Sequence, residues 1–197
     1  LALFKQKYVW LFFLGIFCYV STEQGTSIFM STFLEQYHGV NPQTDGAQAV
    51  SYLWGLMTAG CLVGMLLLKL IDSKRLLQIS GVLTIVLLLS ALFGSKGIAL
   101  IAFPAVGFSI SMMYSIVFSL ALDSASQHHG SFAGILCSAI VGGAGGPMII
   151  SMLADATSLR TGMLIILVFV GYITFIGFWA HPLINNKTVS LKELFKK

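Results

Sequence analysis

Long apolar stretches separated by short polar segments run through the whole chain. Six stretches are long enough to cross a bilayer as helices that rise about 1.5 Å per residue, namely residues 8–33, 49–71, 76–93, 98–122, 131–153 and 162–181. Hydrophobic residues make up 57% of the chain and charged residues only 9%, a balance that excludes a water-soluble domain. The pattern predicts an all-α integral membrane protein, with a six-span bundle over residues 1–182 and a basic tail over residues 183–197.

Lysine and arginine residues are distributed unevenly between the two ends of the predicted spans. With a cytoplasmic N-terminus, nine of the eleven lie inside, and only Lys96 and Arg160 lie outside. Cytoplasmic loops of membrane proteins carry such an excess of basic residues. We therefore expect both termini in the cytoplasm and the tail along the inner membrane surface. The net charge of +4 then reflects this asymmetry and needs no nucleic acid partner.

One charged side chain, Glu23, lies in the middle of a predicted span. A carboxylate at the bilayer centre costs about 2.5–3.5 kcal/mol on insertion scales, so it normally faces a cavity or a partner helix. Serine, threonine and glutamine residues surround it over residues 21–27, which favours a polar path for a solute. The alternative is a structural acid that is hydrogen-bonded to a neighbouring helix.

Cysteine and histidine residues give no sign of a cofactor or a metal site. Cys18, Cys61 and Cys137 lie in different spans without ligand-like spacing, and the histidine pair His128 and His129 falls in a short loop. The spans hold no arrangement of serine, histidine and aspartate for a hydrolase. The glycine-rich stretch VGGAGGP lacks the preceding strand and the following Lys-Ser/Thr of a phosphate loop. We expect neither a cofactor nor an enzyme.

Small residues form a regular pattern in the fifth span. They recur at every fourth position, as Gly134, Ser138, Gly142 and Gly146. Such a ridge lets another helix backbone come close. Gly145, Gly146 and Pro147 are also expected to break or bend the helix at mid-membrane, where transporters often have a hinge. Packing alone is the alternative interpretation of the same residues.

The fourth span carries a polar face with one aromatic ring. Ser111, Tyr114 and Ser115 fall near one stripe together with Gly107 and Phe118. Serine hydroxyls can hydrogen-bond a polyhydroxylated solute while a tyrosine ring stacks on its apolar side. The same hydroxyls can instead bond to a neighbouring helix or to their own backbone carbonyls. Both interpretations stay open at the level of sequence.

Four stretches of the chain carry a family resemblance. They read YVSTEQG, LWGLMTAGCLVG, VFSLALDSAS and GILCSAIVGGAGGPMIISMLAD. They resemble the C-terminal half of sugar–proton symporters of the fucose permease type, in the major facilitator superfamily, over about residues 8–182. The cytoplasmic loop after the second span, with Asp72, Lys74 and Arg75, is similar to a short loop motif of that superfamily.

The resemblance implies a fold of twelve spans in two six-helix bundles, with the sugar held between them. This chain would supply spans 7–12, and the first bundle would be its missing partner. The implied function is proton symport of a monosaccharide, fucose or another hexose, by alternating access in the bacterial inner membrane. The implied sugar-binding residues are Glu23, Gln24, Tyr19, Ser27, Ser111 and Tyr114, and Glu23 is also the candidate for proton coupling.

The chain departs from the family pattern at three positions. Cys61 follows Gly60 where related sequences usually have arginine, while Ile110 and Ser115 stand where they usually have asparagine and proline. Loss of the amide removes a typical sugar contact, so the transported sugar stays open. The alternative function is a six-span protein that acts alone, as a homodimeric carrier or as a structural or signalling membrane subunit.

Overall fold

The computed structural model describes residues 6–125 and 127–183, and all regular structure in that part is helical. The helices follow in the order α1 (Lys7–His38), α2 (Ala47–Leu70), α3 (Ser73–Phe93), α4 (Lys96–Ile110), α5 (Met113–Asp123), α6 (His129–Ser138), α7 (Gly142–Ala156) and α8 (Leu159–Trp179). A short π-helical turn, η2 (Pro42–Gly46), precedes α2, and a 3₁₀ turn, η3 (Ala139–Val141), joins α6 to α7. Each predicted apolar stretch is therefore helical, and the predicted all-α class is confirmed.

Five helical segments of the described chain are long and apolar enough to cross a membrane. They are Pro42–Leu70, Ser73–Phe93, Lys96–Asp123, His129–Ala156 and Leu159–Trp179. The longest helix, α1 with 32 residues, is not among them, because the polar residues around Glu23 lower its mean hydropathy. Composition and length thus support five of the six predicted spans.

Two of the predicted spans are interrupted helices. The fourth breaks between α4 and α5 at Ser111 and Met112, and the fifth breaks at η3. No break occurs at Gly145–Pro147, because these residues lie inside α7, whereas a bend at these residues stays a prediction. A proline lacks the N–H that would bond to the fourth preceding residue, and its ring crowds that carbonyl. Pro147 is the sixth residue of α7, so the carbonyl that its ring crowds is that of Gly143, inside α7 and after η3.

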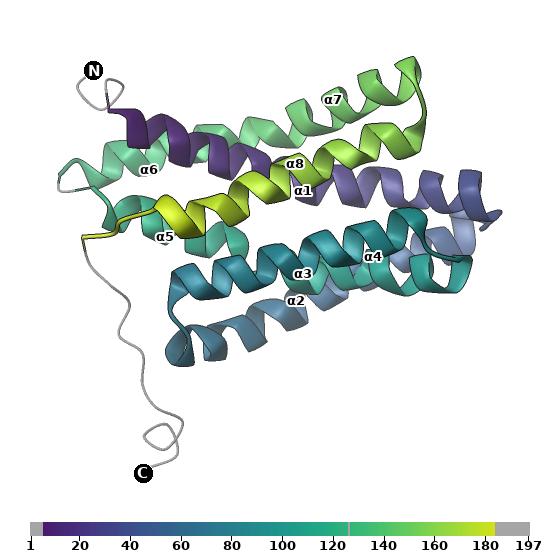
Figure 1. Cartoon of the computed structure of the whole chain (residues 1–197), viewed down its shortest axis with the longest axis horizontal. Helices are drawn as coiled ribbons and strands as arrows, with labels where there is room; N and C mark the ends of the chain where they lie inside the picture. The colour runs from purple at the N-terminus through teal and green to yellow at the C-terminus, as the bar shows by residue number, and fades with distance from the viewer. Residues whose placement is uncertain (1–5, 126, 184–197) are drawn as a thin grey trace, which may run out of the picture.

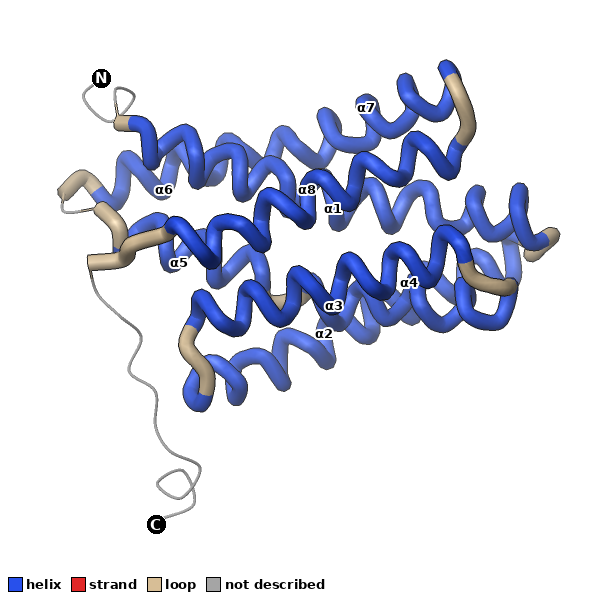
Figure 2. The backbone as a smooth tube through the Cα atoms, in the orientation of Figure 1, coloured by secondary structure: helices blue, strands red, loops and turns tan. Residues whose placement is uncertain are grey.

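The helices form one bundle in which α1 has the most neighbours. It packs against α7, α8 and α5, while α4 lies between α2 and α3, and α3 also packs against α8 (Figure 1). Loops and turns gather at the two ends of the bundle, apart from the short interruption between α4 and α5 (Figure 2). One end carries the start of α1, and we call it the Lys7 end. The other, where α1 stops and α8 begins, is the His38 end.

Short polar motifs stop and start the helices at both ends. Gly39 ends α1 in the left-handed conformation, with φ 60°, which glycine adopts without strain. Asp72 begins α3, since its carboxylate accepts hydrogen bonds from the backbone N–H groups of Lys74 at 3.0 Å and Arg75 at 3.4 Å. The predicted loop motif of Asp72, Lys74 and Arg75 is thus an N-cap at the Lys7 end.

Candidate functional site

The polar centre of α1 holds the predicted carboxylate and its partners. Tyr19, Glu23 and Ser27 follow one another at four-residue intervals, which puts them on one face of the helix. The Gln24 amide donates a hydrogen bond to the Glu23 carboxylate over 3.2 Å. Glu23, Gln24 and Ser27 are half-buried, while Tyr19 is only 5% exposed. Glu23 therefore has a polar partner in Gln24, and its two carboxylate oxygens keep acceptor capacity for further donors.

An aromatic row joins this face of α1 to α5. The rings of Tyr19 and Tyr114 have their centroids 5.6 Å apart, and the Tyr114 ring stacks on Phe118 with centroids 5.8 Å apart and planes inclined by 19°. Tyr19 also interacts with the Glu23 side chain one turn further along α1. The structure thus brings together Tyr19, Glu23, Gln24 and Tyr114 from two elements. A carboxylate, an amide and aromatic faces can hydrogen-bond and stack on a hydroxylated ring.

Ser111 lies outside this cluster, at the interruption between α4 and α5. Its side chain is only 7% exposed, and its hydroxyl donates to the Phe108 carbonyl over 2.8 Å. A Cβ added at Gly60 would collide with Ser111, so the two residues hold α2 and α4 close together. The Cys61 thiol donates to the Ser111 carbonyl over 3.4 Å. Of the two interpretations of Ser111, the bond to its own backbone is the one observed.

Half of the predicted ridge of small residues, Gly142 and Gly146, contacts α1. A Cβ added at Gly142 would collide with the Phe17 carbonyl, and one added at Gly146 would collide with Ser21. The Ser21 hydroxyl donates to the Gly142 carbonyl over 3.1 Å. The prediction is wrong for Gly134 and Ser138, which are exposed. The reason is η3, because a 3₁₀ turn has about 3.0 residues per turn and shifts the face that α6 presents.

Gly145 adds a looser contact to the same pair of helices. A Cβ at this position would lie 3.0 Å from the Phe17 ring. Gly143 faces Gln24, whose Cγ would lie 3.5 Å from an added Cβ. Sequence reasoning found the glycines but missed Phe17 and Ser21, their partners on α1. No local signal marks these partners, since they are more than 120 positions away along the chain.

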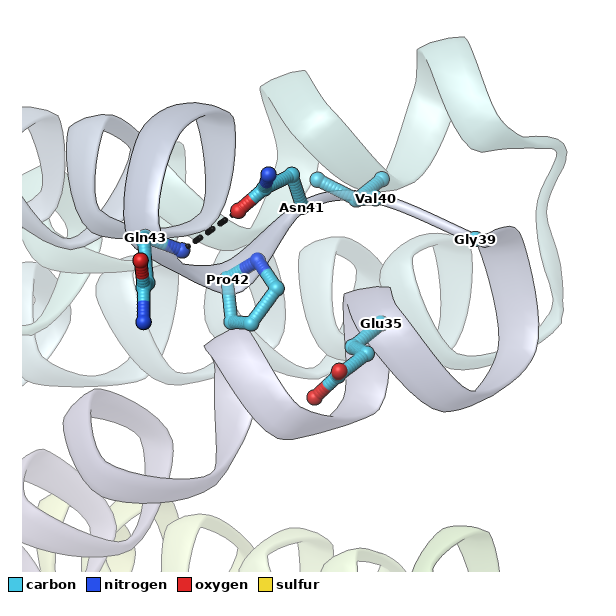
Figure 3. Close-up of a pocket in the computed structure, with 6 residues that line it drawn as sticks. All are labelled: Glu35, Gly39, Val40, Asn41, Pro42 and Gln43. Carbon is cyan, nitrogen blue, oxygen red and sulfur yellow. Dashed lines mark hydrogen bonds between the residues drawn. The ribbon is translucent and has the colours of Figure 1, made fainter.

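A hollow of about 540 Å³ lies at the His38 end, beside the turn between α1 and η2. It is lined by Glu35, Gly39, Val40, Asn41, Pro42 and Gln43 (Figure 3). The backbone N–H of Gln43 donates to the Asn41 side chain over 2.9 Å, an arrangement that closes the turn on itself. All six residues come from one continuous segment, so the shape of the turn explains the hollow without a ligand.

Metal-ligating side chains do not gather in this fold. Among residues 6–125 and 127–183, no group of three histidine, cysteine, aspartate or glutamate residues could hold a metal ion. The three cysteines are free, with Cys18 buried, Cys61 half-buried and Cys137 exposed.

The sequence is similar to bacterial sugar transporters. It is 35% identical over 166 residues to the glucose/galactose transporter of Brucella abortus, and the match covers 83% of this chain and 40% of that protein. A putative glucose/galactose transporter of Helicobacter pylori is 32% identical over 143 residues, 73% of this chain and 35% of that protein. The chain thus spans less than half the length of these relatives. A scan against protein-family models finds no match.

Solved structures share the fold. The fucose:proton symporter of Escherichia coli superposes with a TM-score of 0.84 and 18% identity, over 91% of this chain and 44% of that one. A second structure of that symporter, in the outward conformation and described as a Major Facilitator Superfamily transporter, gives a TM-score of 0.83 with the same identity. The match covers 90% of this chain and 43% of that one. The fold is therefore that of one half of such a transporter.

Proposed function

Because this chain matches the C-terminal half of a sugar transporter of the major facilitator superfamily, we propose that it is one bundle of a two-bundle monosaccharide carrier. The named relatives, transporters of glucose and galactose and a fucose:proton symporter, support a hexose or fucose as the solute. The observation that carries the proposal is the pairing of half-buried Glu23 with Gln24 beside the aromatic row of Tyr19, Tyr114 and Phe118.

We take α1, the first helix of the chain, as a further membrane span, which brings the number of spans to six. Its 32 residues extend over about 48 Å, which exceeds the roughly 30 Å hydrocarbon core of a bilayer. Glu23 then lies near the middle of the membrane, where a carboxylate is costly without polar neighbours. Gln24 supplies one such neighbour, and a sugar hydroxyl would supply another. This arrangement makes the polar centre of α1 the natural midpoint of a solute path.

The site residues divide the recognition of a sugar between polar and apolar groups. Glu23 accepts hydrogen bonds from hydroxyl groups, and the Gln24 amide offers both a donor and an acceptor. The rings of Tyr114 and Phe118 cover the apolar face of the sugar. Tyr19 and Ser27 extend the polar face of α1 on either side of Glu23. Ser111 lies outside this cluster, and its hydroxyl proton is bonded to the Phe108 carbonyl, so the sugar contact predicted for it would be as an acceptor only.

In our proposal, Glu23 also binds and releases the proton that is transported with the sugar. A carboxyl group that binds a proton in one step of the cycle and releases it in another couples solute movement to the proton gradient. Alternating access would come from rocking of this bundle against its partner around the fixed site. The interruptions of the fourth and fifth spans, which adjoin α2 and α1, are where we expect helices to bend during that movement.

Charge supports one orientation in the membrane. The described basic residues at the Lys7 end are Lys7, Lys69, Lys74 and Arg75, against Lys96 and Arg160 at the His38 end. We therefore assign the Lys7 end and both termini to the cytoplasm of a bacterial inner membrane. The basic tail predicted along the inner membrane surface lies, after Leu183, outside the described residues.

Uptake in proteoliposomes tests this function. Labelled glucose, galactose and fucose are offered across an inward proton gradient to the chain joined with its partner bundle, and separately to the 197-residue chain alone. We expect accumulation only with both bundles, and its collapse when a protonophore removes the gradient. Transport by the chain alone would instead support a homodimeric carrier. Absence of uptake from both preparations would contradict the proposal and leave a structural or signalling subunit.

A further inference from the structure

A groove of about 430 Å³ opens between α1 and α7 toward the His38 end, at the turn into α8. Its polar lining consists mainly of Thr32 and Gln36 from α1, Ser151 and Asp155 from α7, and Ser158 from the turn. We infer that this groove is a second binding subsite for the neutral, polyhydroxylated solute, which it holds on the way to Glu23. The inference rests on the proposed function and adds a site to it.

The groove continues the seam that begins at the candidate site. Gln24 on α1 faces Gly143 on α7, and from there both helices run toward the His38 end (Figure 1). Steps of four residues along α1 lead from Gln24 through residues 28 and 32 to Gln36. The same steps along α7 lead from Gly143 through residues 147 and 151 to Asp155. Neighbouring members of each series share a face, and the last two of each series line the groove.

The distance along the seam separates the groove from the candidate site. Gln24 and Thr32 are eight residues apart on α1, a rise of about 12 Å. A monosaccharide that contacts Glu23 therefore cannot contact Asp155 and Gln36 at the same time. The two positions would be occupied in turn, and the groove, at the end that we assign to the outside, would be occupied first.

The lining chemistry fits a hydroxylated and uncharged solute. Asp155 is the one charged residue of the lining, and it lies with uncharged hydroxyl and amide groups. A carboxylate accepts hydrogen bonds from two adjacent hydroxyls, and an amide both donates and accepts. Phe29 adds an aromatic side chain to the lining. The volume lies within the range of about 300–1,000 Å³ typical of small-ligand sites.

Ser158 has a structural task in addition to its place in the groove. Its side chain accepts the backbone N–H of Thr161 at 3.3 Å and begins α8. Substitution there would disturb the helix as well as the groove. Thr32, Gln36 and Asp155 are exposed and Ser151 is half-buried, so these four positions allow changes that leave the packing intact.

Substitution of Asp155 tests the subsite through transport kinetics. In the complete transporter, Asp155→Asn should raise KM for the sugar by about tenfold, because a charge-assisted hydrogen bond is replaced by a weaker one, while kcat stays within about twofold. Asp45→Asn is the matched control, since Asp45 is an exposed acid at the same end that does not line the groove. An unchanged KM in Asp155→Asn, with native thermal stability, would overturn the inference.

Thiol protection tests occupancy directly. The three native cysteines are replaced by serine, Ser151→Cys is introduced, and labelling by a membrane-impermeant maleimide is followed with and without sugar. We expect sugar to slow the labelling at least threefold, also when Glu23→Gln removes the carboxylate of the candidate site. Ala156→Cys, five residues further on α7, is exposed and outside the groove lining, and it should show no protection. Equal labelling of Ser151→Cys with and without sugar would contradict the subsite.

The two proposals fail in different ways. If only the groove assignment is wrong, sugar uptake persists, Asp155→Asn has the native KM, and Ser151→Cys is unprotected. Protection that disappears with Glu23→Gln would also overturn the inference, because the groove would then have no affinity of its own. If the proposed function is wrong, the unmodified transporter takes up no monosaccharide at all.

Discussion

Helices α3 and α8 are continuous, whereas two other spans of the bundle are interrupted. The interrupted spans are α4–α5, which packs on α2, and α6–η3–α7, which packs on α1. Each of the two unbroken helices has 21 residues, and they pack together through Gly81 against Thr174 and through a hydrogen bond of 2.9 Å from the Gln78 amide to the Gly177 carbonyl. The contact joins two continuous backbones along their length. Such a pair is suited to hold its geometry while other parts of the bundle move.

The interrupted spans meet their neighbours at the break itself. The Cys61 thiol of α2 reaches the Ser111 carbonyl where α4 stops, and the Ser21 hydroxyl of α1 reaches the Gly142 carbonyl where α7 starts. A glycine next to each bond lets the two backbones come close, Gly60 in one pair and Gly146 in the other. The comparison teaches that each break is bridged by a side chain of the adjacent helix, on the helices that flank the polar site.

The largest effect is expected where backbones touch beside a break. Gly142→Leu should destabilise the bundle by about 3 kcal/mol or prevent folding, because a Cβ there meets the Phe17 carbonyl, which cannot move alone. Gly134→Leu, in the same interrupted span, meets open space and should unfold like the native protein. Thermal unfolding in detergent measures both variants. Equal stability of the pair would show that α7 does not need close contact with α1.

The unbroken pair gives the next effect. Gly81→Ala should cost about 1–3 kcal/mol, since the added methyl group collides with the Thr174 hydroxyl group, which is itself bonded to the Val170 carbonyl. Gly171→Ala on α8 has open space and should be neutral or slightly stabilising, because alanine favours helix. The same unfolding experiment compares them. A tolerated Gly81→Ala would mean that α3 and α8 can slide, which would remove the contrast with the interrupted spans.

The cation–π contacts of Arg160 at the His38 end should contribute less to the stability of the bundle. The Arg160 guanidinium lies 4.4 Å from the Tyr37 ring centroid, 5.5 Å from that of Phe93 and 5.8 Å from that of Phe33, so it joins α8 to α1 and α3. Arg160→Met should lower stability by about 1 kcal/mol, whereas Arg160→Lys should recover part of the loss. If the lysine variant is no better than methionine, the side chain acts by packing and not by its charge.

The smallest effects concern the side chains that bridge the breaks. Ser21→Ala should cost about 1 kcal/mol and Cys61→Ala about 0.5 kcal/mol, because a thiol is the weaker donor. Cys61→Ser should be neutral or stabilising, since a hydroxyl donates more strongly to the Ser111 carbonyl. Unfolding temperatures of the three variants provide the measurement. A serine variant less stable than the alanine variant would argue against the hydrogen bond at this break.

The helices could be predicted from hydropathy, whereas the breaks could not. All six apolar stretches are helical, and α1 extends beyond the predicted residue 33 to His38 because its polar last turn continues until Gly39. The Ser111 carbonyl at one break is bonded by Cys61, which is 50 positions away, and the glycines of α7 pack against Phe17 and Ser21. Local sequence indicates that Pro147 disturbs a helix but not which residues accommodate it.

Part of the candidate site could be predicted from the sequence, because a charged side chain is costly inside a membrane. The cost of a carboxylate in a span indicated Glu23, and the structure adds Gln24 as its partner. The placement of Tyr114 beside Tyr19 requires the packing of α5 on α1, which no periodicity reveals. The groove was missed for the same reason, because Gln36 and Asp155 approach one another only when α1 and α7 run side by side.

Equilibrium sugar binding to the complete transporter tests the central claim most directly. Binding of labelled galactose or glucose is measured for the native protein, for Glu23→Gln, and for Glu35→Gln, a control at an exposed acid of the same helix. If Glu23 is the sugar ligand, Glu23→Gln should weaken binding by at least tenfold, because an acceptor of two hydroxyls becomes a mixed donor and acceptor, while Glu35→Gln binds normally. Native affinity in Glu23→Gln would contradict Glu23 as the sugar ligand, and native affinity together with undiminished proton-driven accumulation would contradict the site altogether.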